Sequence, residues 1–161
     1  MLYRIATPNV AKWFALCGFP MTVASYEAKP SGAMNPAAVL LVEDDRAIVN
    51  SLADALRGEG FLVAIAENGR EALELLRGGL RPFAIILDLM MPVMDGWDFR
   101  NEQLRDPALR DIPVVVITAT GFSANTIRAQ FGDVALLSKP VPFSELLALL
   151  ERARGAGSPA A

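Results

Sequence analysis

The sequence predicts a doubly wound α/β domain, in which five parallel strands form one sheet and five helices cover both of its faces. Short apolar runs alternate along the chain with segments whose apolar residues recur every three or four positions, and the connections between them are short. Some runs, such as residues 83–87, are apolar at every position. That pattern is typical of central strands that are buried on both faces.

The strand positions follow from the apolar runs. Each run contains five to seven residues and ends at polar or turn-forming residues. The five expected strands are residues 38–42, 61–66, 83–88, 112–118 and 134–138.

The first helix has a clear inner face and a clear end. Ile48, Leu52 and Leu56 are spaced by four residues, so they fall on one side of a helix. Gly58 and Gly60 follow and are expected to stop it.

The second helix is expected to begin at a capping residue. Asn68 precedes it, and Glu71 stands three residues later, as in a variant of the capping box. Its inner face is expected to consist of Leu73, Leu76 and Leu80, with Gly78 and Gly79 loosening its end.

Three further helices are expected at residues 96–105, 123–131 and 143–154. The first of them has the weakest pattern, because only Trp97, Phe99 and Leu104 are apolar. The second is also weak. The last one carries a stripe of apolar residues, namely Phe143, Leu146, Leu147 and Leu150.

Composition excludes several classes of function. The 161 residues are 53% hydrophobic and 20% charged, which suits one domain with a core. The formal net charge is −3 and no run of Lys or Arg occurs, so direct binding of nucleic acid is not expected. Histidine is absent, which excludes Ser-His-Asp and Cys-His catalysis and a phosphohistidine donor. The single cysteine, Cys17, excludes an internal disulfide and fits the cytoplasm.

The ends of the chain differ from its centre. We expect a poorly ordered N-terminal extension at residues 1–36, a domain at residues 37–154 and a flexible tail at residues 155–161. No effector domain is visible after the last helix. The output is therefore expected to pass through a partner protein.

An apolar segment at residues 13–25 does not predict a membrane span. It is 13 residues long and is interrupted by Gly18 and Pro20. Two alternatives stay open: this segment belongs to a signal peptide, or translation starts at Met34.

Polar side chains follow the ends of four expected strands: Glu43 and Asp44, then Asp88, Thr118 and Lys139. Because the carboxyl ends of parallel strands meet at one edge of a sheet, these groups are expected to converge there. Crowded carboxylates favour a hard divalent cation such as Mg²⁺, which prefers oxygen ligands. The lysine and the hydroxyl suit an anion on the far side of that cation, and phosphoryl is the natural anion. For Asp88 alone, a turn or helix cap is the alternative.

Four motifs carry a resemblance to a known family: VLLVEDD, ILDLMMPVMDG, VVVITA and LLSKPV. The intervals are 44 residues from Asp44 to Asp88, 30 to Thr118 and 21 to Lys139. In this order and spacing the sequence resembles response regulator receiver domains, the phosphoacceptor modules of two-component signalling, over residues 37–152. The resemblance implies a flavodoxin-like sheet with strand order 2-1-3-4-5.

The resemblance also implies individual roles. Asp88 would accept the phosphoryl group as an acyl phosphate. Asp44 would bind Mg²⁺ directly and Glu43 would bind it through water, with Asp88 and the backbone of Met90 completing the site. Asp45 is expected to cap a helix or to lie in solvent instead.

The remaining two site residues would act on the phosphoryl oxygens. Lys139 would pair first with Asp88 and then with the phosphoryl group, and a cis peptide bond to Pro140 is expected. Thr118 would move its hydroxyl onto a phosphoryl oxygen, which would shift the surface formed by residues 123–131, 134–138 and 143–154.

The chain departs from the family at Leu136, where Tyr or Phe is frequent. Three interpretations stay open. Leu136 reports the state by a smaller repacking, the output uses another surface, or Leu136 is simply a strand residue that faces the helix at residues 143–154.

The expected activity is not that of a turnover enzyme. Met90 and Thr120 would flank an attacking water and carry no acid, base or amide, so slow autodephosphorylation is expected. A haloacid-dehalogenase-like phosphatase would have a second acid at Met90, and a nucleotide-binding fold would have a Gly-rich loop after the first strand. A receiver-like scaffold that binds proteins without phosphorylation remains the alternative.

The resemblance implies the partners as well. A sensor histidine kinase or a histidine phosphotransfer protein would supply the phosphoryl group, and a downstream effector protein would receive the signal. Phosphorylation-dependent homodimerisation is allowed. Neither nucleic acid nor a membrane is expected as a direct partner.

Overall fold

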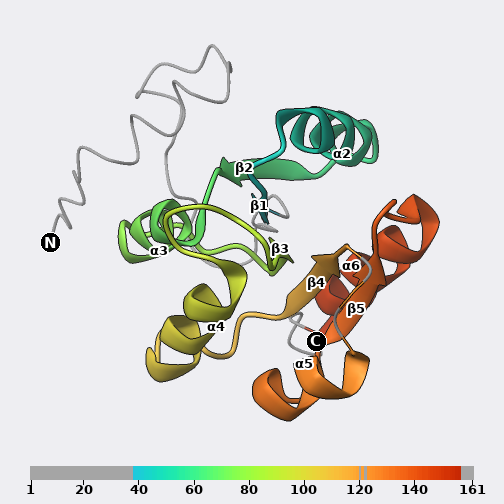
Figure 1. Cartoon of the computed structure of the whole chain (residues 1–161). Coiled ribbons are helices and arrows are strands. Elements are labelled where there is room, and N and C mark those ends of the chain that lie inside the picture. Colours follow the sequence, from blue (N-terminus) through green and yellow to red (C-terminus); the bar gives the residue numbers. More distant parts are fainter. Residues whose placement is uncertain (1–37, 120, 122, 157–161) are drawn as a thin grey trace, which may run out of the picture.

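The computed structural model describes residues 38–119, 121 and 123–156. Within these residues, five parallel strands form one sheet in the order β2-β1-β3-β4-β5 (Figure 1). The expected fold class and strand order are confirmed. The strands are β1 (Ala38–Val42), β2 (Leu62–Ala66), β3 (Ala84–Asp88), β4 (Val114–Thr118) and β5 (Ala135–Ser138).

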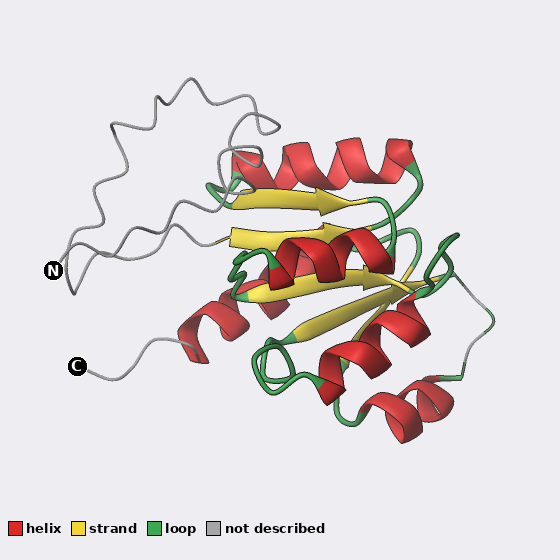
Figure 2. Cartoon of the chain, turned by 90° about the vertical axis from the view of Figure 1, so that its left-hand side faces the viewer, coloured by secondary structure: helices red, strands yellow, loops and turns green. Residues whose placement is uncertain are grey.

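Five helices of the described residues cover the two faces of this sheet. They are α2 (Arg46–Gly58), α3 (Gly69–Arg77), α4 (Gly96–Arg105), α5 (Ala124–Phe131) and α6 (Phe143–Ala156). Helices α2 and α6 lie on one face and α3, α4 and α5 on the other (Figures 1 and 2). None of the helices described is long and apolar enough to cross a bilayer.

Residue alternation along the strands explains why their sequences are apolar throughout. In β1, Leu40 and Val42 belong to the core under α3, α4 and α5. Val39 and Leu41 belong to the core under α2 and α6. Since both faces are covered, neither set of positions can be polar without losing buried apolar contact.

The end of the domain differs slightly from the expected boundaries. Helix α6 continues through Gly155 and Ala156, two residues that were expected in the tail. The expectations for residues 1–36, including the segment at 13–25 and Met34, and for residues 157–161 lie outside the described residues.

Two predicted helix caps are confirmed. The Asp45 carboxylate accepts hydrogen bonds from the backbone N–H groups of Ala47 and Ile48, at 2.8 and 3.3 Å, and begins α2. The Asn68 side chain accepts from Glu71 N at 3.0 Å and begins α3. The Glu71 carboxylate accepts from Glu67 N at 2.8 Å, one residue before the cap.

Helix α4 has a polar inner face, which explains its weak sequence pattern. Arg100 and Gln103 are buried beside Phe99. The Gln103 amide donates to the carbonyl oxygens of Leu109 and Ile112, at 3.0 and 3.1 Å. These bonds fix the connection to β4, so side-chain hydrogen bonds do here what apolar packing does in α2 and α3.

One interpretation of Leu136 is wrong. Leu136 packs against the core that contains Ile127 and Phe131 of α5, on the face opposite α6. The neighbouring Leu137 faces α6. Because successive strand residues point to opposite faces, a residue at 136 cannot face the last helix while Leu137 does.

Candidate functional site

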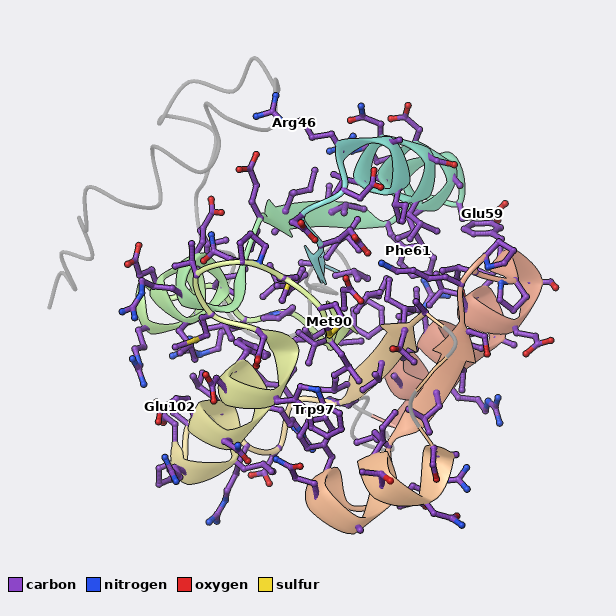
Figure 3. The ribbon with its side chains drawn as sticks, viewed as in Figure 1. Arg46, Glu59, Phe61, Met90, Trp97 and Glu102 are labelled. Atoms are coloured by element: carbon purple, nitrogen blue, oxygen red, sulfur yellow. The ribbon has the colours of Figure 1, made fainter. Side chains whose placement is uncertain are left out.

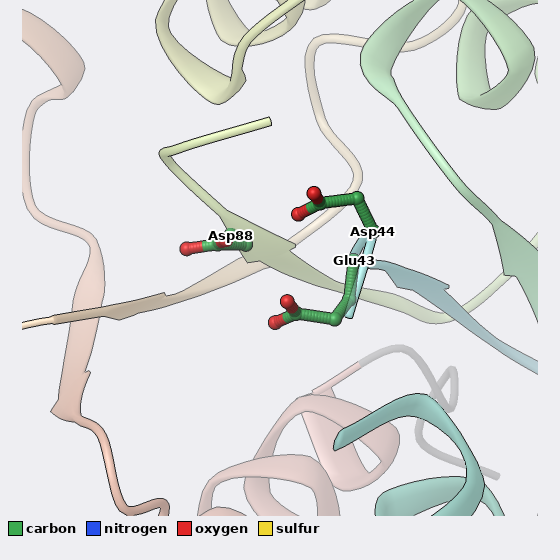
Figure 4. A group of neighbouring side chains, drawn as sticks. All are labelled: Glu43, Asp44 and Asp88. Atoms are coloured by element: carbon green, nitrogen blue, oxygen red, sulfur yellow. The ribbon is translucent and has the colours of Figure 1, made fainter. Parts of the chain in front are cut away.

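Three carboxylates meet at the carboxyl edge of the sheet. Val42 of β1 pairs with Leu87 of β3, so Glu43 and Asp88 continue neighbouring strands at the same level. Glu43, Asp44 and Asp88 each offer an oxygen atom, and these atoms lie within 4.8 Å of one another (Figure 4). Glu43 and Asp88 are 1% and 3% exposed, whereas Asp44 is open to solvent.

Lys139 lies between the two buried carboxylates. Its Nζ donates a hydrogen bond to Glu43 Oε1 at 3.0 Å and is 2.8 Å from Oε2. The same Nζ is 3.1 Å from Asp88 Oδ2. The end of β5 brings this lysine to the edge, where its backbone N–H donates to Thr118 O at 2.9 Å. The peptide bond from Lys139 to Pro140 is cis, as expected.

Burial and mutual pairing set the protonation of this group. Burial raises the pKa of Glu43, while the hydrogen bond from Lys139 lowers it and the charge of Asp88 raises it further. For Lys139, burial alone would lower the pKa, but the hydrogen bonds and charges of Glu43 and Asp88 outweigh it and the pKa is raised. The lysine therefore remains an ammonium in this acidic setting.

The donor set fits a hard divalent cation. Counted by formal charges, the three carboxylates and the ammonium sum to −2. All three carboxylates supply oxygen, which Mg²⁺ prefers, and the exposed Asp44 leaves the site open to water. The cluster therefore has the charge, the ligand type and the access that such an ion requires.

Thr118 and Met90 lie at the same edge but outside these contacts. Thr118 is the last residue of β4, is 8% exposed, and donates its hydroxyl to Ala119 O at 3.2 Å. Met90 follows Asp88 by two residues (Figure 3), and 60% of its surface is exposed. Thr120 lies outside the described residues.

Gly96 lies against the backbone of the site, a role that the sequence analysis did not predict. It begins α4, and its N–H donates to Leu89 O at 3.1 Å. A Cβ at this position would lie 2.2 Å from the backbone oxygen of Asp88 and 2.8 Å from Leu89 Cα. The pair Asp95-Gly96 at the end of the second motif was the available signal, because Gly often marks a close approach of backbone.

Gly96→Ala should destabilise the domain by about 1–3 kcal/mol, since the added methyl group collides with backbone that cannot rotate away. Urea unfolding followed by circular dichroism measures this. Gly58→Ala is the matched control, because Gly58 is also helical and a Cβ there meets nothing within 4 Å. Equal stability of the two variants would contradict the close approach.

The chain matches known proteins over this fold. Residues 39–151 match the family model of the response regulator receiver domain. The response regulator MprA of Mycolicibacterium vanbaalenii is 40% identical over 134 residues, which cover 78% of this chain and 57% of that protein. The chain spans about half the length of the curated relatives it matches.

Solved structures agree with the fold. The signal receiver domain of a signal transduction histidine kinase from Syntrophus aciditrophicus has a TM-score of 0.69 at 28% identity, covering 78% of this chain and 95% of that one. The chemotaxis response regulator CheY4 of Vibrio cholerae has a TM-score of 0.65 at 30% identity, covering 74% and 99%.

Proposed function

Since this chain belongs to the family of response regulator receiver domains, we propose that Asp88 is the residue that accepts the phosphoryl group in two-component signalling. One observation carries this proposal. The Asp88 carboxylate is buried, is paired with the ammonium of Lys139 and shares a cluster with two further carboxylates. The family implies a histidine kinase as donor and an effector downstream. For this chain, a kinase or a histidine phosphotransfer protein is the proposed donor.

The transfer needs little besides positioning and charge. An oxygen of the Asp88 carboxylate attacks phosphorus, the new O–P bond forms, and the bond from phosphorus to the donor nitrogen or oxygen breaks with its electron pair leaving on the donor. A carboxylate attacks as its anion, so no general base is required. Lys139, which already contacts Asp88, would hold a phosphoryl oxygen.

The carboxylate cluster would hold Mg²⁺. Asp44, Asp88 and the backbone carbonyl of Met90 would bind it directly and Glu43 through water. When bound, the ion neutralises charge on the phosphoryl oxygens.

Hydrolysis of the acyl phosphate is expected to be slow. The Met90 side chain lies in solvent at this edge and has no group that accepts a proton or orients a water molecule. The protein would therefore hold the phosphoryl group instead of turning over a substrate. Receiver domains are not enzymes in the ordinary sense.

Thr118 would connect the phosphoryl group to the surface of α5, β5 and α6. In the structure its hydroxyl is satisfied by the Ala119 carbonyl, so a phosphoryl oxygen would compete as a stronger, charged acceptor. An acceptor that favours one position of Thr118 shifts the population toward that position.

An aromatic contact between α4 and α5 is a second connection between the site and α5. Trp97 lies next to Gly96 in α4 (Figure 3). It packs against Phe131 at the end of α5, with ring centroids 4.7 Å apart. With Leu136 on this same face of β5, we propose that the Trp97–Phe131 pair takes part in the change of shape.

Thr118→Ala should still accept the phosphoryl group. The change in Trp97 fluorescence on phosphorylation should be smaller than in the parent by about fivefold or more. Trp13→Phe is needed in the background, since the chain has two tryptophans. Thr118→Ser keeps the hydroxyl and is the control. A full fluorescence change in Thr118→Ala would contradict the role of the hydroxyl.

The function is tested by incubating the protein with acetyl phosphate and Mg²⁺ and measuring its intact mass. One added phosphoryl group is expected, and none after removal of divalent ions with EDTA. No mass gain under either condition would favour a scaffold that binds proteins without phosphorylation.

A further inference from the structure

A pocket of about 320 Å³ lies at the amino ends of the strands, whereas Asp88 lies at their carboxyl ends. Val114 and Ala135 line it, and these are the first residues of β4 and β5. Asp88 and Thr118 are the last residues of β3 and β4. Because parallel strands run in one direction, the pocket and the carboxylate cluster are separated by the length of a strand.

The pocket contains a buried cation without a counter-ion. Arg100 of α4 lines it and is 7% exposed. Its guanidinium makes one hydrogen bond, from Nη1 to Gln103 Oε1 at 2.7 Å, and its buried Nε has no acceptor. Among the described residues, no carboxylate lies within ion-pair distance of it.

An unpaired buried guanidinium is energetically costly. Burial lowers the pKa of Arg100, which reports the loss of water around the charge. Arginine keeps its proton in proteins, so the charge cannot be relieved by deprotonation. An anion in the pocket would compensate this charge.

The other charged groups that line the pocket limit the charge of this anion. Arg110 and Asp111 face one another, with Arg110 Nε 3.9 Å from Asp111 Oδ1, and the Asp111 side chain is 89% exposed. Asp133 is also exposed. These two carboxylates lie in water, where their field is screened, but they would still repel a doubly charged anion more than a singly charged one.

The remaining wall is apolar. Val134, just before β5, and Leu149 and Ala153 from α6 contribute to this wall. A ligand with one charged end and an apolar body matches both parts.

We propose that this pocket binds a small monocarboxylate, whose carboxylate pairs with Arg100 and whose apolar part lies against Val134, Leu149 and Ala153. Binding there requires no phosphoryl group on Asp88.

Benzoate is the probe, followed by NMR of backbone amides in the ¹⁵N-labelled full chain. Saturable shifts are expected at the amides of residues 111, 112, 114, 115 and 133–135, with a dissociation constant in the millimolar range. Benzamide has the same shape without the charge and should bind about tenfold more weakly or not at all. Inorganic phosphate, which carries up to two charges, should also bind more weakly than benzoate.

Arg100→Met should weaken benzoate binding about tenfold or more, because the replacement keeps an unbranched apolar stem but removes the guanidinium and its charge. Arg105→Met is the matched control on the same helix, since Arg105 does not line the pocket and pairs with Glu102 in solvent. Should Arg100→Met not fold, Arg100→Lys keeps the charge and loses the planar fork, and its binding should fall at least threefold.

Four results would overturn the proposal. They are equal binding of benzoate and benzamide, tighter binding of phosphate, unchanged binding in the Arg100 variants, and no shifts at these residues with benzoate.

Discussion

Asp88→Asn is expected to abolish the phosphoryl group gained from acetyl phosphate in the presence of Mg²⁺. The amide is nearly the same size as the carboxylate and keeps the fold, but it lacks the anionic oxygen that attacks phosphorus. Intact mass spectrometry checks this directly. Urea unfolding should place the variant at or above the stability of the parent, since one of three crowded carboxylates is removed.

Asp45→Asn is the matched control for this substitution. Asp45 follows Asp44 directly but caps α2 and stays outside the carboxylate cluster. Asparagine is an equally good cap, so the unfolding equilibrium constant and the phosphoryl uptake should both stay within about twofold of the parent values. Retained uptake in Asp88→Asn, or lost uptake in Asp45→Asn, would place the acceptor elsewhere.

Lys139→Met should slow phosphoryl uptake by about 10²–10³-fold. The ammonium is the cation that touches both Glu43 and Asp88, and its removal takes away the positive charge aimed at the transferred group. It also leaves Glu43 buried without its partner, so Glu43 should bind a proton more readily. Initial rates from intact mass, at equal acetyl phosphate and Mg²⁺, measure the change.

Arg46→Met separates this effect from a general loss of positive charge. Arg46 begins α2 and makes an exposed ion pair with Glu67 at 3.5 Å, so its removal should change stability by less than about 1 kcal/mol. The rate of uptake should be unchanged. A Lys139→Met rate within about threefold of the parent would show that the ammonium is not needed for transfer.

The sheet was predictable because its residues obey simple rules. Runs such as Ala84–Leu87 are buried on both faces, so every residue in them is apolar. The caps at Asp45 and Asn68 were predictable for a similar reason, since a side chain that bonds to its own chain needs no tertiary information.

The features that the sequence did not indicate depend on contacts between distant segments. The sequence does not indicate that the polar residue Gln103 is buried on the inner face of α4. It is buried because its amide donates to the carbonyl groups of Leu109 and Ile112. Gly96 matters because the backbone of Asp88 passes beside it. The side of the sheet on which Leu136 lies depends on the exact start of β5, and a shift of one residue reverses it.

The members of the candidate site and the contact between Lys139 and Asp88 were predictable, but the other side-chain contacts were not. Parallel strand ends bring Glu43, Asp88 and Lys139 together by topology alone. That Lys139 contacts both oxygens of Glu43, and that the Thr118 hydroxyl bonds to its neighbour's carbonyl, depends on side-chain conformations that no sequence pattern specifies.

The most direct test is to locate the phosphoryl group chemically. Borohydride reduces an acyl phosphate on aspartate to homoserine, which tandem mass spectrometry places at a single residue after proteolysis. With acetyl phosphate and Mg²⁺, homoserine should appear at position 88, and it should be absent when EDTA replaces the metal. Homoserine at another aspartate, or at none while the intact mass rises, would contradict the assignment of Asp88 as the phosphoryl acceptor.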